Sequence, residues 1–119
     1  MKIAALVLVI LVAVFHVLIM VVEMFFWDTP IGHKIFLLTS ETAKITQIIA
    51  MNQGLYNGFL AAGLFWGAFN KRFDVKVFFL VCVIVAGVFG AVTFKPSIFF
   101  TQGLPAVLAL AAVWLARDK

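Results

Sequence analysis

Four long apolar stretches cover almost all of this 119-residue chain, and they constrain its fold more than any other feature. They lie at about residues 3–26, 43–69, 75–94 and 98–116, and each is close to the roughly 20 apolar residues needed to cross a bilayer. Hydrophobic residues make up 66% of the chain and charged residues 12%, whereas soluble domains average about half and about a quarter. We therefore predict an all-α fold, a four-helix transmembrane bundle that forms a single domain over residues 1–119.

The first predicted span ends in turn chemistry. Residues 27–30 read Trp-Asp-Thr-Pro, an aromatic interface anchor followed by helix-breaking residues. The mixed segment that follows, residues 31–44, is predicted to lie at the interface with a short helix, and His33 is predicted to be a solvated loop residue. Thr39 or Ser40 is a candidate cap for the second long helix.

The basic residues gather at the predicted helix ends, which favours membrane topology over nucleic-acid binding as the reason for the net charge of +4. An even number of spans places both termini on the same side. Six basic residues lie on that side, against three on the opposite side, so both termini are predicted to be cytoplasmic. The first group is Lys2, Lys71, Arg72, Lys76, Arg117 and Lys119; the second is Lys34, Lys44 and Lys95.

Two ionisable residues, His16 and Glu23, lie inside the first predicted span. Ionisable groups are costly in a membrane helix, so they usually face the bundle interior and often mark function. With Met20 and Trp27 they have the i, i+4, i+7, i+11 spacing of one helix face. Glu23 can act as a proton donor, a base or a counter-ion, and His16 can relay a proton near neutral pH.

Polar side chains from other predicted spans lie at a depth similar to that of Glu23. The second and fourth spans both run inward, so Asn52, Gln53 and Gln102 can share a layer with Glu23, and Asn57 and His16 lie beneath that layer, His16 about 10 Å deeper than Glu23. We expect the Glu23 face of the first span to pack against residues 52–57 of the second, with Gln102 nearby. Amide groups both donate and accept hydrogen bonds, so they can orient a polar head group. The predicted ligand-binding residues are Asn52, Gln53, Tyr56, Asn57, Gln102 and Trp27. One His and one Glu are too few for a metal site, and we predict no cofactor.

Three segments carry a resemblance to a known family. Residues 16–27 read HVLIMVVEMFFW, residues 52–62 read NQGLYNGFLAA, and residues 102–105 read QGLP. Together they resemble the DUF1304 family of small bacterial membrane proteins of about this length. The resemblance spans nearly the whole chain and implies a four-helix integral membrane protein, but it implies no activity.

Three functions remain open from the sequence. The first is binding of a small lipophilic molecule with a polar head, with proton-transfer chemistry such as isomerisation, cyclisation or epoxide opening if the protein is an enzyme. In that case Glu23 is the acid and His16 the relay. The second is a small transporter that uses Glu23 as its coupling carboxylate, and the third is a structural or partner-binding subunit. In each case we expect a multi-pass protein of the bacterial inner membrane, with the lipid bilayer as partner, no nucleic acid, and a homo-oligomer as a further option.

Overall fold

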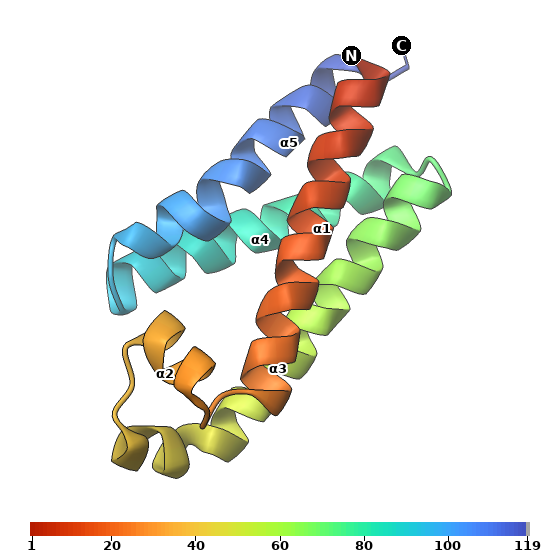
Figure 1. The fold of residues 1–119 in the computed structure, drawn as a ribbon. Coiled ribbons are helices and arrows are strands. Elements are labelled where there is room, and N and C mark those ends of the chain that lie inside the picture. The colour runs from red at the N-terminus through yellow and green to blue at the C-terminus, as the bar shows by residue number, and fades with distance from the viewer. Residues whose placement is uncertain (119) are drawn as a thin grey trace. The chain divides into compact units, whose positions relative to one another are not determined.

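The computed structural model describes residues 1–118, and over these residues helices joined by short turns are the only regular secondary structure, with no strand. This confirms the all-α class. The described elements are α1 (Lys2–Phe25), α2 (Pro30–Phe36), α3 (Ser40–Phe69), α4 (Phe73–Thr93), the π-helical segment η1 (Phe99–Gly103) and α5 (Leu104–Leu115) (Figure 1). Lys119, counted above among the cytoplasmic cations, lies outside the described residues.

The four predicted spans correspond closely to α1, α3, α4 and the η1–α5 segment. Within the described chain, α1 and α4 are long and apolar enough to cross a membrane, and the apolar helix over Phe99–Leu115 is shorter. The start of α3 is set by Thr39, whose hydroxyl accepts a hydrogen bond from the Thr42 backbone N–H at 3.1 Å. Thr39 is therefore the cap that the sequence allowed at this position.

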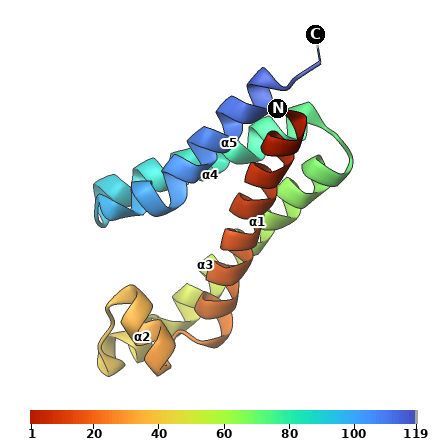
Figure 2. The same cartoon turned by 45° about the horizontal axis from the view of Figure 1, so that its top comes forward.

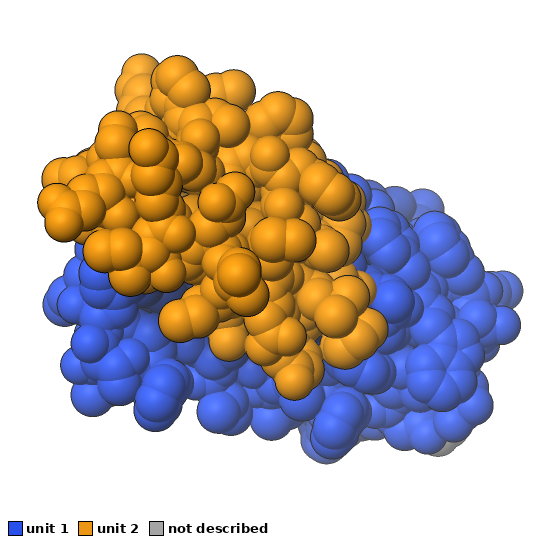
Figure 3. Space-filling view, turned by 90° about the horizontal axis from the view of Figure 1, so that it is seen from below, with its two compact units in different colours: residues 1–14, 60–119 blue, residues 15–59 orange. Residues whose placement is uncertain are grey.

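The chain forms two compact units, which are coloured separately in Figure 3. Unit 1 combines Met1–Val14 with the chain from Leu60 onward, and unit 2 is Phe15–Phe59. The boundary falls inside α1 and inside α3, so each of these helices contributes one part to each unit.

Unit 1 has a hydrophobic core built from four helical segments. In it, α4 packs against η1 and α5, which lie beside it in both ribbon views (Figures 1 and 2). The backbones approach closely at Gly87 of α4 and Gly103 of η1, since a Cβ added at Gly87 would lie 2.8 Å from the Gly103 backbone. The buried core residues are Ala5, Val9, Val12, Ala13, Leu64, Ala68, Leu80, Val83, Ala106, Ala109, Ala112 and Val113.

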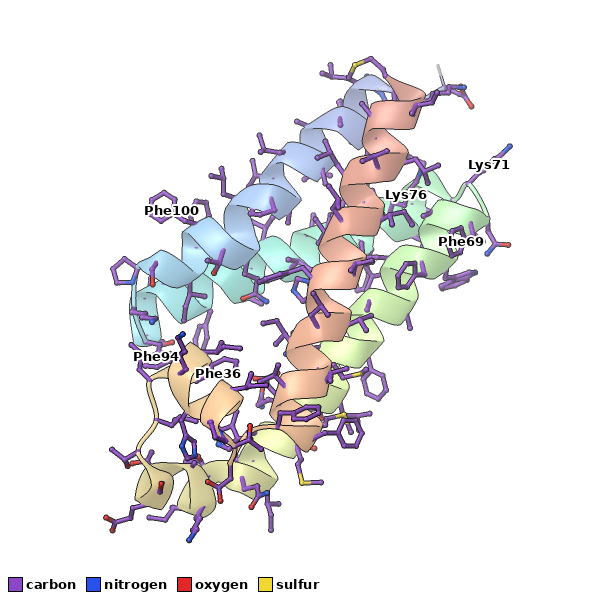
Figure 4. The ribbon with its side chains drawn as sticks, viewed as in Figure 1. Phe36, Phe69, Lys71, Lys76, Phe94 and Phe100 are labelled. Atoms are coloured by element: carbon purple, nitrogen blue, oxygen red, sulfur yellow. The ribbon has the colours of Figure 1, made fainter. Side chains whose placement is uncertain are left out.

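The last predicted helix begins with a π-helical turn, which the sequence did not indicate. Pro105 sits in the first turn of α5, and because proline has no N–H it cannot donate to the carbonyl four residues earlier. The wider η1 turn directly precedes it. Phe100 of this segment points away from the ribbon (Figure 4) and is 65% exposed.

In unit 2, the chain turns sharply from α1 into α2. Gly32 lies directly against the end of α1, and a Cβ at this position would overlap the carbonyl oxygens of Phe26 and Trp27. Thr29 caps α2 by accepting a hydrogen bond from the Gly32 N–H at 3.3 Å. Only glycine fits this approach, so the position of α2 against the end of α1 depends on it.

The prediction that His33 is a solvated loop residue is wrong. His33 lies in α2, and its Nε2 is 2.8 Å from Asp28 Oδ1, with both side chains mostly covered. His33 and Asp28 are five residues apart in the sequence, and α2 brings their side chains together. This contact could be predicted only if the helix itself had been assigned to His33.

Candidate functional site

The two polar residues that the structure brings together are Glu23 of α1 and Asn57 of α3. Asn57 Nδ2 donates a hydrogen bond of 2.6 Å to Glu23 Oε1, and the same group lies 3.3 Å from the Gln53 carbonyl oxygen. Both side chains are half-buried. The prediction that the Glu23 face of the first helix packs against residues 52–57 is confirmed at this hydrogen bond.

A close backbone approach holds the pair in place. A Cβ added at Gly54 would lie 2.6 Å from Met24 Cγ, 3.0 Å from Glu23 Cβ and 3.1 Å from the Met20 carbonyl oxygen. One turn further along α3, a Cβ at Gly58 would meet the Met20 sulfur at 2.7 Å. The two glycines let α1 approach α3 more closely than larger residues would, which brings the short Asn57 side chain within reach of Glu23.

The pair has unused hydrogen-bonding capacity. Among the described residues, Asn57 is the hydrogen-bond partner of the Glu23 carboxyl group, and Glu23 Oε2 and Asn57 Oδ1 have none. Among the described residues that are not exposed, every fully buried side-chain nitrogen or oxygen has a hydrogen-bond partner. These two oxygens are therefore accessible, and they can meet a group that donates a hydrogen bond or carries positive charge.

Trp27, at the end of the predicted face, makes a specific contact. Its Nε1 donates a 2.9 Å hydrogen bond to the Thr46 hydroxyl, and its ring lies 4.7 Å from that of Phe36. Thr46 in turn donates to the Thr42 carbonyl oxygen. The indole thus contacts α2 through Phe36 and the start of α3 through Thr46. Its N–H already donates to Thr46 and is not free to bind a ligand.

His16 is buried, with 1% of its surface exposed, and its ring meets the edge of Phe15. It lies on α1 two turns before Glu23, which is about 10 Å along the helix axis. His16 therefore does not form part of a directly bonded pair with Glu23, and a proton passing between them would need an intermediate carrier.

The other predicted ligand-binding amides and Tyr56 lie on α3 and in η1. Asn52, Gln53 and Tyr56 are exposed, and Asn52 is about 140° around α3 from Asn57. Gln102 lies in η1 and belongs to unit 1. Within the described chain, no group of three His, Cys, Asp or Glu side chains gathers as metal ligands would.

Two features of this region were missed from the sequence. Thr46 as the partner of Trp27 was not singled out, although a tryptophan with one side covered generally needs an acceptor for its N–H. Met24 also packs at Gly54, outside the predicted stripe. The spacing of Gly54 and Gly58 was the available signal for the close approach.

The fold and this site define an all-α protein with two helices capable of crossing a membrane and one hydrogen-bonded carboxyl group at the end of the first. The family described as "Protein of unknown function (DUF1304)" matches residues 10–114, and the chain belongs to this family. The chain is also similar to the "Uncharacterized protein YpaA" of Lactococcus lactis subsp. lactis (strain IL1403), with 30% identity over 114 residues, 92% of this chain and 96% of that protein. No solved structure matches the chain.

Proposed function

We propose that this protein is a multi-pass protein of the bacterial cytoplasmic membrane, in which α1, α3, α4 and the η1–α5 segment all cross the bilayer. The exposure of the apolar helices supports this placement. Only 28% and 22% of the most apolar windows of α1 and α4 are buried within the protein, whereas the core helix of a soluble protein is mostly covered. In water such surfaces would form apolar patches far larger than monomeric soluble proteins carry.

Within the membrane, the proposed function is binding of a small lipophilic molecule through its polar head. The observation that carries this proposal is the Glu23–Asn57 pair, which leaves one carboxyl oxygen and one amide oxygen accessible. A carboxyl group that only fixed helix packing would use both oxygens on neighbouring helices, because unpaired polar atoms are costly in hydrocarbon. A ligand head that donates two hydrogen bonds would occupy both oxygens.

Proton transfer is the chemistry that this site could add to binding. A carboxyl group beside an apolar ligand can donate a proton to an alkene, an epoxide or a carbonyl oxygen and later recover it. Isomerisation, cyclisation and epoxide opening are the corresponding reaction classes. Glu23 is the residue in position to touch the ligand, and His16 lies too deep to do so directly.

Native mass spectrometry of the protein purified in mild detergent tests this proposal. The wild-type protein should retain a lipophilic molecule as a defined mass increment. Glu23→Gln keeps the shape and the hydrogen bond to Asn57 but removes the proton and the charge, so occupancy should fall at least about tenfold. Glu41→Gln is the matched control, because Glu41 is an exposed acid in the first turn of α3.

The outcomes separate binding from packing. Loss of the adduct in Glu23→Gln, with thermal stability and the Glu41→Gln variant unchanged, supports the ligand site. Full retention of the adduct in Glu23→Gln would contradict it and leave a structural role for this face. A wild-type protein that carries no adduct and gains none from a bacterial lipid extract would also contradict it.

A further inference from the structure

One face of α3 within unit 2 carries a heptad pattern that no neighbouring helix covers. Ile45, Ile48, Asn52, Leu55 and Phe59 follow one another at alternating spacings of three and four residues. These positions fall within about 80° of the helix circumference. All five are exposed, the four apolar ones by between 43% and 80%. Alternating three- and four-residue spacing is the pattern of a helix that packs against a second parallel helix.

Asn52 occupies the centre of this face and has no partner within the described residues. An amide that faces lipid leaves two donors and an acceptor unbonded, which is costly in hydrocarbon. In membrane helices such side chains instead bond across to another helix. Something that can both donate and accept is therefore expected on this face.

We infer that a second copy of this chain covers the face, so that α3 pairs with α3 in a parallel homodimer through Asn52. An amide is its own complement, because two copies related by a two-fold axis can exchange a donor and an acceptor. The membrane fixes all copies in the same orientation, which makes the parallel pairing available. No charged residue occurs between Lys44 and Lys71, so like charges do not oppose the contact.

The position of Asn52 in the pattern supports two chains. If Ile45 is assigned to position a of the heptad, then Asn52 and Phe59 are also at a, and Ile48 and Leu55 are at d. A single Asn at position a sets register and oligomer state in parallel coiled coils, and it lowers stability relative to an apolar residue in water. In a membrane the apolar residues gain little from pairing, so the amide supplies a larger share of the affinity.

This inference goes beyond the ligand site, because Asn52 lies on a different side of α3 from Asn57. It also assigns Asn52 and its neighbour Tyr56 to an interface and not to the ligand. Tyr56 adjoins the face and its ring meets the edge of Phe59 at 5.8 Å. The two proposals share only the membrane placement, so the dimer can be tested without any ligand.

Cysteine cross-linking in native membranes tests the pairing on a Cys82→Ala background. Ile48→Cys and Leu55→Cys each keep Asn52 and should give a disulfide-linked dimer on mild oxidation. Ala50→Cys is the control, because Ala50 is 4% exposed and lies away from the heptad face. Absence of dimer from both d-position variants would overturn the inference, as would an equal yield from Ala50→Cys.

The role of Asn52 is tested by adding Asn52→Leu to the Ile48→Cys variant. The dimer dissociation constant should rise about tenfold, as measured by cross-linked fraction against protein dilution in detergent. Asn52→Gln, which keeps an amide, should retain most of the association. Unchanged cross-linking in Asn52→Leu would show that the amide does not drive pairing. If native mass spectrometry shows only monomer at concentrations where the cross-link forms, the cross-link reflects random collision between monomers. That result would overturn the inference.

Discussion

At the scale of single residues, the Glu23–Asn57 hydrogen bond is the contact on which the proposed site depends. Its length of 2.6 Å and its position between α1 and α3 make Asn57 the group that orients the carboxyl. Hydrogen bonds to a charged or strongly polar partner are typically short and directional. Removing the amide therefore alters the carboxyl's geometry as well as its energy.

Replacing Asn57 by Ala should destabilise the protein by about 0.5–2 kcal/mol, the range for hydrogen bonds between membrane helices. The loss should shrink when Glu23→Leu is already present, because the partner is then gone. Chemical or thermal unfolding in detergent measures both variants and the double variant. Asn70→Ala serves as control, since Asn70 is exposed in the α3–α4 turn and its side chain donates to the Trp66 carbonyl oxygen of the adjoining helix α3. Additive effects of the two substitutions would mean that the pair is not coupled.

The sequence predicted that Glu23 meets an amide of the second long helix, but it could not say which one. The sequence places Asn52 in the layer of Glu23 and Asn57 beneath it, but the structure joins Glu23 to Asn57, which lies about 140° around α3 from Asn52. The choice between them depends on the rotation of α3, which is set by where Gly54 permits the α1 backbone to approach. A glycine pair marks a close approach without indicating its partner, so this part of the site emerged only from the structure.

At the scale of elements, Gly54 and Gly58 make different contacts although they look equivalent in the sequence. A Cβ at Gly54 would press on the Met20 carbonyl oxygen and on Glu23 Cβ, which cannot move without shifting α1. A Cβ at Gly58 would meet only the end of the flexible Met20 side chain. The close approach of the two helices thus depends mainly on Gly54.

Gly54→Ala should cost about 1–3 kcal/mol of stability through overpacking. Gly58→Ala should be close to neutral or stabilising, because Met20 can move aside and alanine favours the helix by roughly 0.5–1 kcal/mol. Thermal unfolding in the same detergent compares the two. Equal effects of the two alanine substitutions would show that the backbone approach at Gly54 is not as the structure has it.

Helix bounds were predictable to within about three residues because apolar length and turn residues determine them, as at residues 27–30. The π-helical turn of η1 could not be predicted, although Pro105 follows it in the first turn of α5. Proline requires that one carbonyl lose its usual donor, but several local geometries meet that requirement. The geometry observed here accompanies the contact between Gly87 and Gly103, which are sixteen residues apart.

At the scale of the whole molecule, charge and aromatic residues gather at the end of unit 1 that carries both termini. Lys2 Nζ lies 2.8 Å from Asp118 Oδ1, and the hydrogen bond and charge of Lys2 hold the pKa of Asp118 below its usual value. The Phe73 ring at the start of α4 lies 5.6 Å from that of Trp114 near the end of α5, and Arg117 stacks over Trp114.

The turn between α3 and α4 adds further cations to this end of unit 1. Lys71 lies in this turn, between Phe69 at the end of α3 and Lys76 near the start of α4 (Figure 4). Arg72 lies 5.9 Å above the Trp66 ring and pairs with Asp74. Basic residues mixed with tryptophan are typical of the cytoplasmic interface of a membrane protein.

Both termini should therefore be cytoplasmic, and reporter fusions test this directly. Alkaline phosphatase, which is active only outside the cytoplasm, should be inactive when fused after the C-terminus. The same reporter fused after Leu38 follows α1 alone and should be active, because one crossing brings that point to the outside. Green fluorescent protein at the two positions should give the reverse pattern.

If only α1 and α4 crossed the membrane, the termini would still share a side, but the α3–α4 turn would lie opposite them. A phosphatase fusion after Arg72 separates the two cases: it is inactive if α3 crosses and active if α3 stays outside. An active reporter at the C-terminus would overturn the charge argument and the depths assigned to Glu23 and Asn57.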